Sequence, residues 1–387
     1  MQLFEVNDRK SAKDFLLINV LINKGDRNYI RPLDKDINDV FDKEKNKTFR
    51  HGDVTRWLLR DNDGKLIGRI AAFTNKKYKN KGDDVSIGGI GFFDCINSQE
   101  AADILFNVAK HWLMQKGMEA MDGPINFGER DRWWGLLVEG FDPPVYCLNY
   151  NPPYYRQLFE TFGFRCFFNQ ICFARNVQGD LKPKFFERHA RFFNDPDYSA
   201  SYINKNQLGK YAEYFTEVYN KAWSGHGGLK EMNRQVVLKM FESMKPVMDE
   251  KVIWFAFHKE RPIAMWINLP DLNQWFKRLN GQFNLIAKLK FLWLKTFTTP
   301  DKFTGIVFGI VPEYQGTGID SFMIVEGAKV IQHKLAYQVF EMQWIGDFNP
   351  KMINIGESLD TYRSRTLTTY RYLFDRTKEF HRHPILG

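Results

Sequence analysis

Long hydrophobic runs and paired cysteines are both missing from this sequence. No stretch approaches the roughly 18 consecutive apolar residues of a membrane-spanning helix, and residues 1–15 lack the apolar segment of a secretory signal peptide. The four cysteines form no CxxC pair, which argues against a zinc site and against a disulfide framework. We therefore expect a soluble cytoplasmic protein with no membrane span and no metal site.

A strong excess of charge is also missing, and the rest of the composition is that of an ordinary globular protein. The 387 residues carry a net charge of +9, which favours polyanionic partners such as coenzyme A or nucleic acid only weakly at this length. With 44% hydrophobic residues, including 35 Phe, 16 Tyr and 10 Trp, the chain can fill sizeable cores. This composition excludes disordered and fibrous classes, and the length favours two domains over one.

The expected secondary structure repeats in the two halves of the chain. Each half starts with a helix, followed by a hairpin, a buried strand, a helix, a second strand, and a short helix with a terminal strand. These elements are expected at 11–24, 55–75, 86–96, 98–117, 118–127 and 152–176 in the first half, and at 208–222, 252–270, 303–312, 321–336, 338–348 and 350–374 in the second. The order predicts an α/β fold with a mixed sheet flanked by helices in each half.

The repeat also predicts the domain boundaries. We expect a first domain at 1–176, a charged and poorly periodic linker at 177–198, and a second domain at 199–387. An insertion at 273–297 interrupts the second domain.

The sharpest motif is the segment 311–320, which reads Val-Pro-Glu-Tyr-Gln-Gly-Thr-Gly-Ile-Asp and lies between an expected buried strand and an expected helix. Glycines at such a turn let the backbone approach a phosphate, and the unpaired N–H groups of a helix N-terminus favour negative charge. The motif predicts an anion site, and an ordinary strand-to-helix turn is the alternative.

This motif resembles the signature of the GNAT (Gcn5-related) N-acetyltransferases, in which Gln or Arg is followed by two residues, Gly, one residue, and Gly or Ala. The resemblance implies that the backbone of this turn binds the pyrophosphate of acetyl-CoA or another acyl-CoA, and that the preceding strand pairs with the pantetheine arm. It extends to two tandem GNAT-like domains. The cofactor-binding residues that it implies are Ile310, Val311, Gln315, Gly316, Thr317, Gly318, Ile319, Asp320 and Asn349.

Three departures from the family pattern bear on the chemistry. Asp320 stands where the family has Gly or Ala, and its carboxylate would either repel the pyrophosphate that it faces or cap amides in the first turn of the helix. Gly356 stands seven residues after Asn349, where the family has the tyrosine that protonates the departing thiolate. Leu359 and Asp360 replace the closing Gly-Phe. Another proton donor, with Tyr362 as the nearest tyrosine in sequence, or none, is implied.

The corresponding turn of the first half, residues 94–100, contains no glycine, and Asn97 with Glu100 reads as a helix capping box. The later segment 150–164 does resemble the family's helix that opens with Asn and ends with Gly-Phe. We therefore expect the first half to be a GNAT-like domain that has lost cofactor binding.

A loop dense in charge and aromatic side chains follows a strand of the first half. Paired Trp beside Arg suits recognition of a polar group on an apolar body, and packing between domains is the alternative. The candidate substrate residues in this loop are Glu129, Arg130, Arg132, Trp133 and Trp134.

The insertion 273–297 has five basic residues and no acidic one, interleaved with apolar side chains. We expect it to pack on protein with its lysines in water. A lid over an acyl-substrate cleft and a helix on an anionic membrane are the alternatives.

Two candidate general bases remain, His226 in a loop between two helices and Glu341 on the strand after the cofactor site. The sequence thus predicts an acyl-CoA-dependent N-acyltransferase for a small-molecule amine, whose identity the sequence does not give. The alternatives are an aminoacyl transferase that uses charged tRNA, the one nucleic acid we consider, and a non-catalytic acyl-CoA-binding protein.

Overall fold

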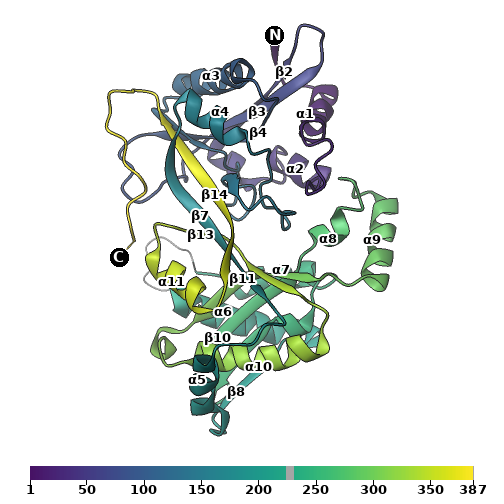
Figure 1. Ribbon diagram of the computed structural model, residues 1–387, viewed down its shortest axis with the longest axis vertical. Coiled ribbons are helices and arrows are strands. Elements are labelled where there is room, and N and C mark those ends of the chain that lie inside the picture. Colours follow the sequence, from purple (N-terminus) through teal and green to yellow (C-terminus); the bar gives the residue numbers. More distant parts are fainter. Residues whose placement is uncertain (224–230, 387) are drawn as a thin grey trace.

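The computed structural model describes residues 1–223 and 231–386. In this part of the chain the strands form a single 14-stranded mixed sheet that runs the length of the molecule (Figure 1). The strands are β1 (Gln2–Glu5), β2 (Gly52–Arg60), β3 (Leu66–Asn75), β4 (Ile87–Cys95), β5 (Ala120–Gly123), β6 (Leu136–Glu139), β7 (Arg165–Asn176), β8 (Tyr198–Tyr202), β9 (Trp254–His258), β10 (Arg261–Pro270), β11 (Lys302–Ile310), β12 (Val339–Met342), β13 (Ile345–Gly346) and β14 (Tyr362–Leu373).

Their order in the sheet is β1-β2-β3-β4-β5-β14-β7-β12-β11-β10-β9-β8, with β13 paired to β7 and β6 to β14. Each half contains an antiparallel hairpin, β2–β3 or β9–β10, a third antiparallel strand, β4 or β11, and a parallel neighbour, β5 or β12. The expected α/β architecture and the repeated order of elements are therefore confirmed.

The terminal strands of the two halves lie side by side in the middle of the sheet. β7 and β14 form a long antiparallel pair from Tyr362 opposite Ala174 to Arg371 opposite Arg165. β14, the last strand of the chain, also pairs with β5 of the first half, whereas β7 pairs with β12 of the second half. Each half thus completes its sheet with the other half's last strand, so the two predicted domains share one sheet.

Helices cover both halves of the sheet (Figure 1). They are α1 (Arg9–Ile22), α2 (Asp34–Val40), α3 (Gln99–Gln115), α4 (Tyr155–Phe162), α5 (Pro183–Phe193), α6 (Leu208–Trp223), α7 (Arg234–Met244), α8 (Asn273–Phe276), α9 (Leu285–Phe297), α10 (Ile319–Lys334) and α11 (Pro350–Ser358). None of the helices in the described residues is both long and apolar enough to cross a membrane.

Two details differ from the sequence predictions. α3 is capped by Ser98, whose side chain accepts from the N–H of Ala101, and not by Asn97. The cap lies one residue later because the Ser98 hydroxyl meets the N3 amide, which an N-cap side chain can satisfy. The segment 177–198, expected as a linker, contains α5, which packs on α10 through the buried His189 and its contact with Glu326 (Nε2 to Oε1, 2.7 Å).

Candidate functional site

The second half of the sheet opens between β11 and β12. These parallel strands pair only from Lys302 opposite Val339 to Gly305 opposite Met342. A register shift against β10 then leaves Ile306 as an extra residue, and β11 continues to Ile310 while β12 ends. Because a β-bulge bends its strand, β11 turns away from β12 at this point. The result is a wedge-shaped opening within the sheet.

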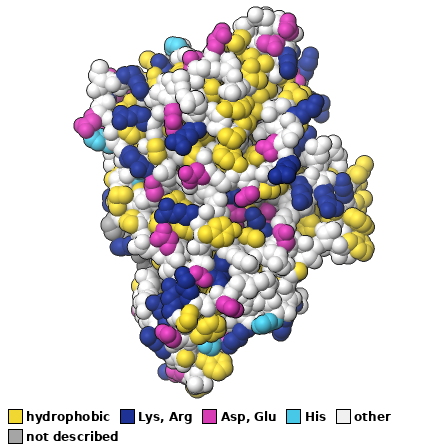
Figure 2. All heavy atoms as spheres, viewed as in Figure 1, with side chains coloured by type: hydrophobic (Ala, Val, Ile, Leu, Met, Phe, Trp, Pro, Cys, Tyr) yellow, Lys and Arg dark blue, Asp and Glu magenta, His cyan; other side chains and the backbone are white. Residues whose placement is uncertain are grey.

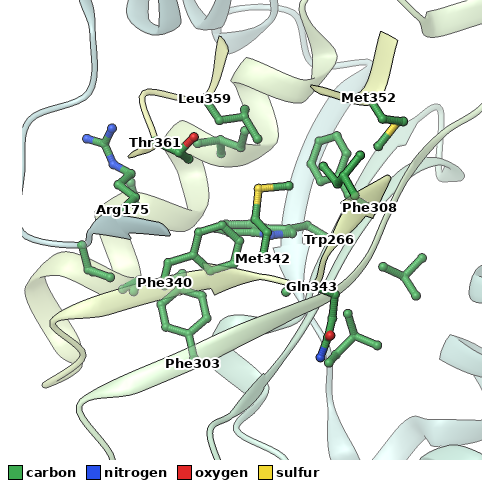
Figure 3. A pocket seen from close by; sticks show the side chains of 18 of the residues that line it. Arg175, Trp266, Phe303, Phe308, Phe340, Met342, Gln343, Met352, Leu359 and Thr361 are labelled. Carbon is green, nitrogen blue, oxygen red and sulfur yellow. The ribbon is translucent and has the colours of Figure 1, made fainter. Parts of the chain in front are cut away.

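A cavity of about 390 Å³ fills this opening. Its walls are mostly aromatic and aliphatic side chains, and Figure 3 shows several of them converging on the same space. The strands supply Trp266, Phe303, Ile306, Phe308, Phe340 and Met342, and the helices and loops supply Tyr219, Trp223, Ile324, Trp344, Met352 and Leu359. Its volume lies within the usual range for small-molecule sites.

Few polar groups line the cavity, and the charged one is already engaged. Arg175 donates to the Asp360 carboxylate (2.8 Å) and to main-chain carbonyls of Asp360, Gly179 and Asp180. The others on its wall are Gln332, Gln343 and Thr361. An apolar cavity with so few polar groups suits a hydrocarbon chain far better than a polar metabolite.

The glycine motif forms the turn between β11 and α10. Gly316 (φ 75°) and Gly318 (φ 100°) both adopt left-handed backbone conformations, which favour glycine. A Cβ added to Gly316 would meet no atom of the described chain within 4 Å, whereas one added to Gly318 would lie 3.1 Å from Cβ of Arg188. Gly316 therefore offers open backbone, and Gly318 also makes room for α5.

The first turn of α10 has unused hydrogen-bonding capacity. Gly318, its N-cap, offers no side chain to the first amides, and Oγ of Ser321 is buried without a partner among the described residues. The side chains of Gln315 and Thr317 instead bond within the turn, to the carbonyls of Ile310 (3.1 Å) and Tyr314 (2.7 Å). An uncapped helix N-terminus beside an open glycine fits a phosphate group.

Ile310 and Val311, which the family resemblance implies in cofactor binding, differ in the hydrogen bonds of their backbone N–H groups. The N–H of Val311 donates to the carbonyl of Ile263 (2.9 Å) and is not available to a ligand. Because successive N–H groups of a strand point to opposite edges, the N–H of Ile310 points toward the edge that β12 leaves open. The implied role therefore suits the backbone of Ile310 and does not suit that of Val311.

Glu341 lies beneath the opening, in a buried ion-pair cluster. Its carboxylate accepts from Arg365 (Nε to Oε1, 2.6 Å) and Lys302 (Nζ to Oε2, 2.9 Å), and it is only 1% exposed. Although burial raises its pKa, these two cations hold the pKa below its ordinary value overall. The assignment of Glu341 as a general base stays a prediction, but its oxygens are occupied and a lowered pKa makes a weak base.

Asn349 and Gly356 lie at the two ends of α11. Asn349 is the N-cap, and its side chain accepts from the N–H of Met352 (3.2 Å). Gly356 is buried, and a Cβ there would lie 2.8 Å from Cδ2 of Phe173 on β7. Close packing against Phe173 leaves no room for the tyrosine that the family carries at this position.

The other two catalytic candidates are Tyr362 and His226. Tyr362, at the start of β14, is 57% exposed, and it does not line the cavity, although its neighbour Thr361 does. His226 lies outside the described residues. Of these two candidates the structure thus places Tyr362 alone, at the surface and away from the cavity wall.

The side chains of the charged and aromatic loop at residues 129–134 mainly pack against neighbouring residues of the first half. Trp133 and Trp134 are 7% and 3% exposed. Arg130 lies over the rings of Tyr78 and Trp134 and donates to Oδ1 of Asn80 (3.2 Å). Arg132 and Glu129 form a loose ion pair at the surface (3.7 Å). A substrate role for these residues stays a prediction, because these contacts account for the two Trp side chains and Arg130 by packing.

The first half does not repeat this apolar cavity at the corresponding place, although a wider and more polar hollow of about 870 Å³ lies elsewhere in it, with Phe49, Asn75 and Lys116 on its wall. The place between β4 and α4 holds a cavity of about 60 Å³. Its wall includes Asp94, which is buried against Arg69 (2.6 Å) and accepts from Asn19 and Tyr155. Burial raises the pKa of Asp94, and Arg69 opposes this shift. The space that is apolar and open in the second half is polar and filled in the first.

The sequence interpretation missed the cavity itself. Its residues are scattered over β7, β10, β11, β12, α6, α10 and α11, and each reads as an ordinary core residue in its own element. One signal was present, the pair Gly305 and Ile306 inside a strand, because a glycine within a strand often marks a bulge.

Comparisons with known proteins agree with this architecture. No protein-family model matches the chain. The bacterial ceramide synthase of Caulobacter vibrioides is 22% identical over 374 residues, covering 96% of this chain and 97% of that protein. Protein YghO of Escherichia coli is 23% identical over 367 residues, covering 91% and 90%.

A solved structure extends the likeness to three dimensions. The tandem GNAT protein from the clavulanic acid biosynthesis pathway, determined without AcCoA, matches with a TM-score of 0.55 at 10% identity, covering 97% of this chain and 99% of that one. At this identity the likeness shows the fold. Together with the repeated strand order and the opening between β11 and β12, it shows that the chain is a tandem GNAT-fold protein.

Proposed function

We propose that this protein transfers a long-chain acyl group from acyl-CoA to the amino group of a lipid amine. The observation that carries the proposal is the apolar cavity of about 390 Å³ where β11 and β12 separate. β11 leads from the cavity wall at Phe308 to the glycine turn that would receive the pyrophosphate, and no residue of that turn lines the cavity itself. An acyl chain attached to CoA would enter the cavity from that side.

The character of the cavity favours a long chain over acetyl. Phe303 and Phe340 line one side of it, and Phe308 and Met352 line the other (Figure 3). An acetyl group would leave this apolar space empty, whereas a hydrocarbon chain would gain about 0.8 kcal/mol for each methylene that it buries.

The residues that would hold CoA are those of the turn. The uncapped amides of α10 would meet the pyrophosphate beside Gly316, and the backbone of Ile310 would meet the pantetheine arm. CoA supplies an activated thioester, and the chain's contribution is to hold that thioester and to exclude water from it.

The reaction forms one bond and breaks one. The neutral amine attacks the thioester carbonyl, a C–N bond forms, the C–S bond breaks, and the amine's proton passes to solvent. The N–H of Ile310 would donate to the developing oxyanion. With Gly356 closed by Phe173, the sulfur leaves as the thiolate, which a thiol with a pKa near 8 to 9 can do without a dedicated acid.

The relatives support the amine half of the proposal. One of the two curated relatives is named bacterial ceramide synthase, and a ceramide is a long-chain amino alcohol acylated on nitrogen. A lipid amine of this kind is therefore a better first acceptor than a polyamine or a charged tRNA. Use of acyl-CoA also suits the cytoplasmic location expected from the sequence.

The test is a matrix of donors and acceptors. Purified protein is incubated with acetyl-CoA or palmitoyl-CoA and with sphinganine, spermine or charged tRNA, while released thiol is followed and products are identified by mass spectrometry. We expect N-palmitoylsphinganine as the main product. Acetyl transfer to spermine would instead indicate a polyamine acetyltransferase, and transfer from charged tRNA would indicate an aminoacyl transferase. Tight palmitoyl-CoA binding without any turnover would reduce the protein to an acyl-CoA-binding protein.

A further inference from the structure

Helix α9 has one apolar face inside the protein. Ala287, Phe291 and Leu294 are buried and pack on α8 and on Leu33 of the first half. The rings of Phe291 and Trp275 lie 5.8 Å apart. This inner face agrees with the expectation that the insertion packs on protein, and it fixes the orientation of α9.

A second apolar face of α9 points to solvent. Six large side chains on it have exposed fractions between 53% and 77%. They are Leu285, Ile286, Leu289, Leu292, Trp293 and Phe297. At about 100° per residue, these six fall within an arc of about 140° opposite the buried residues. Figure 2 shows hydrophobic side chains gathered at this outer edge, where α9 projects from the molecule in Figure 1.

Basic side chains lie on both sides of this outer face. On the same helical projection, Lys288 and Lys295 fall on one flank and Lys290 on the other. The ammonium groups of Lys290 and Lys295 lie against the carbonyls of Arg278 (2.6 Å) and Pro246, so these two side chains reach from α9 to the loops that follow α8 and α7. Lys277 and Arg278 are also exposed, and the insertion has no acidic residue.

From this pattern we propose that the outer face of α9 (Leu285, Ile286, Leu289, Leu292, Trp293 and Phe297) binds the surface of an anionic lipid bilayer. The apolar face would enter the boundary between headgroups and acyl chains, and the flanking lysines would meet lipid phosphates. With 13 residues, α9 is about 20 Å long and lies on the bilayer without crossing it.

Charge complementarity favours this occupant over the others. In a face-to-face pair of two copies, the basic flanks of one α9 would oppose those of the other. A bilayer with anionic headgroups satisfies the apolar centre and both basic flanks at the same time. The inference is independent of the proposed acyl transfer, because none of the residues that it uses lines the cavity or belongs to the glycine turn.

The experiment is co-sedimentation of the full-length protein with vesicles of phosphatidylcholine containing 0 or 30% phosphatidylglycerol. We expect most of the protein to sediment with the anionic vesicles at about 100 mM salt, and much less with the neutral ones or at high salt. The double variant Ile286→Glu, Trp293→Glu should bind at least tenfold more weakly. The matched control is Leu17→Glu, Leu21→Glu, two exposed residues on α1, which should bind as the wild type does.

Thermal unfolding and light scattering complete the test. Both double variants should keep the wild-type melting temperature within a few degrees, because the replaced side chains are exposed. Equal sedimentation of the α9 variant and the wild type, or no sedimentation of folded wild type with any vesicle, would overturn the proposal. If the wild type forms a dimer that the α9 variant does not form, and the wild type does not bind vesicles, the outer face of α9 mediates self-association instead. Acyl transfer to a detergent-solubilised acceptor should persist in the α9 variant, which separates this proposal from the proposed function.

Discussion

The Cβ position of Gly356 lies 2.8 Å from Cδ2 of Phe173, a side chain with no exposed surface. The contact joins α11 of the second half to β7, the last strand expected in the first. It explains in steric terms why the tyrosine that donates a proton in the resembled family is absent here. Met352 of α11 and Leu359, its C-cap, line the cavity in the opening between β11 and β12, and position 356 supplies no acid there.

We predict that Gly356→Ala lowers the free energy of unfolding by about 1–2 kcal/mol, because the added methyl overlaps a ring that cannot move, a cost that exceeds the gain in helix propensity. Urea unfolding measures this change. In a Phe173→Leu background the same replacement should cost little or should stabilise the protein. A full cost in that background would show that Phe173 is not the obstacle.

Two substitutions of Gly316 distinguish the effect of an added charge on CoA binding from the effect of an altered backbone. Asn and Asp are the non-glycine residues that best tolerate its left-handed backbone, and a Cβ there meets open space. Gly316→Asp places a carboxylate beside the α10 N-terminus and should weaken CoA binding at least tenfold, measured by calorimetry. Gly316→Asn has the same shape without the charge and should stay within about threefold of wild type. Equal effects from both would place the pyrophosphate elsewhere.

Glu341→Gln removes the partner of two buried cations. We expect a loss of about 3–5 kcal/mol in stability at pH 7, because Arg365 and Lys302 would keep their charges without the carboxylate. The folded-state pKa of Glu341 is lowered, so its contribution is fully present above its unfolded pKa of about 4.5 and is lost as the pH falls through the folded value. The difference between wild type and variant should therefore shrink below about pH 4.5. If the variant is as stable as the wild type but turns over substrate much more slowly, Glu341 acts as a catalytic base.

Asp271 has the opposite dependence on pH. It accepts from the main-chain N–H groups of Tyr146 and Asn273, and burial raises its pKa from 3.8 to about 6. The folded protein thus binds this proton more tightly than the unfolded chain, so stability falls as the pH rises through that range. Relative to Asp271→Asn, which keeps an acceptor oxygen, the wild type should lose about 2 kcal/mol between pH 4.5 and pH 8. A constant difference across that range would show that Asp271 does not titrate in it.

The sequence predicted most of the fold because hydrophobic periodicity decides local structure. The hairpins, the strands β4 and β11, and the helices α3 and α10 all lie within a few residues of their expected positions. The exchange of β7 and β14 between the halves was not predicted, since both strands have the same apolar pattern wherever they pair. α5 was missed because its buried side chains, Phe185, His189 and Phe192, are separated by a dense run of charges.

The candidate site was predicted less completely, and for a different reason. The glycine motif is local, so its strand-turn-helix setting could be expected from residues 303–336 alone. The cavity depends on where β11 leaves β12, and this is set by one extra residue, Ile306, in the register with β10. Gly305 is a weak signal of this bulge, because a glycine within a strand indicates a local irregularity without fixing which residue is extra. The buried cluster of Glu341 is likewise non-local, because Arg365 reaches it from the exchanged strand β14.

The last prediction follows from the cavity and concerns the length of the acyl chain that the protein accepts. Met342 ends β12, and its side chain points into the cavity (Figure 3). Met342→Trp should fill part of that volume and lower kcat/KM for palmitoyl-CoA at least tenfold, because the outer methylenes of the chain lose their apolar contacts. A short donor such as butanoyl-CoA should be used as well as by the wild type, or better.

The matched control is Ile355→Trp on α11, which adds the same bulk at a residue that is 39% exposed and does not line the cavity. It should leave the preference for long chains unchanged. The measurement is the ratio of kcat/KM for the two donors, because a general loss of folded protein scales both values equally and cancels. A ratio that Met342→Trp does not move would mean that the acyl chain binds outside the opening between β11 and β12, whatever amine the protein acylates.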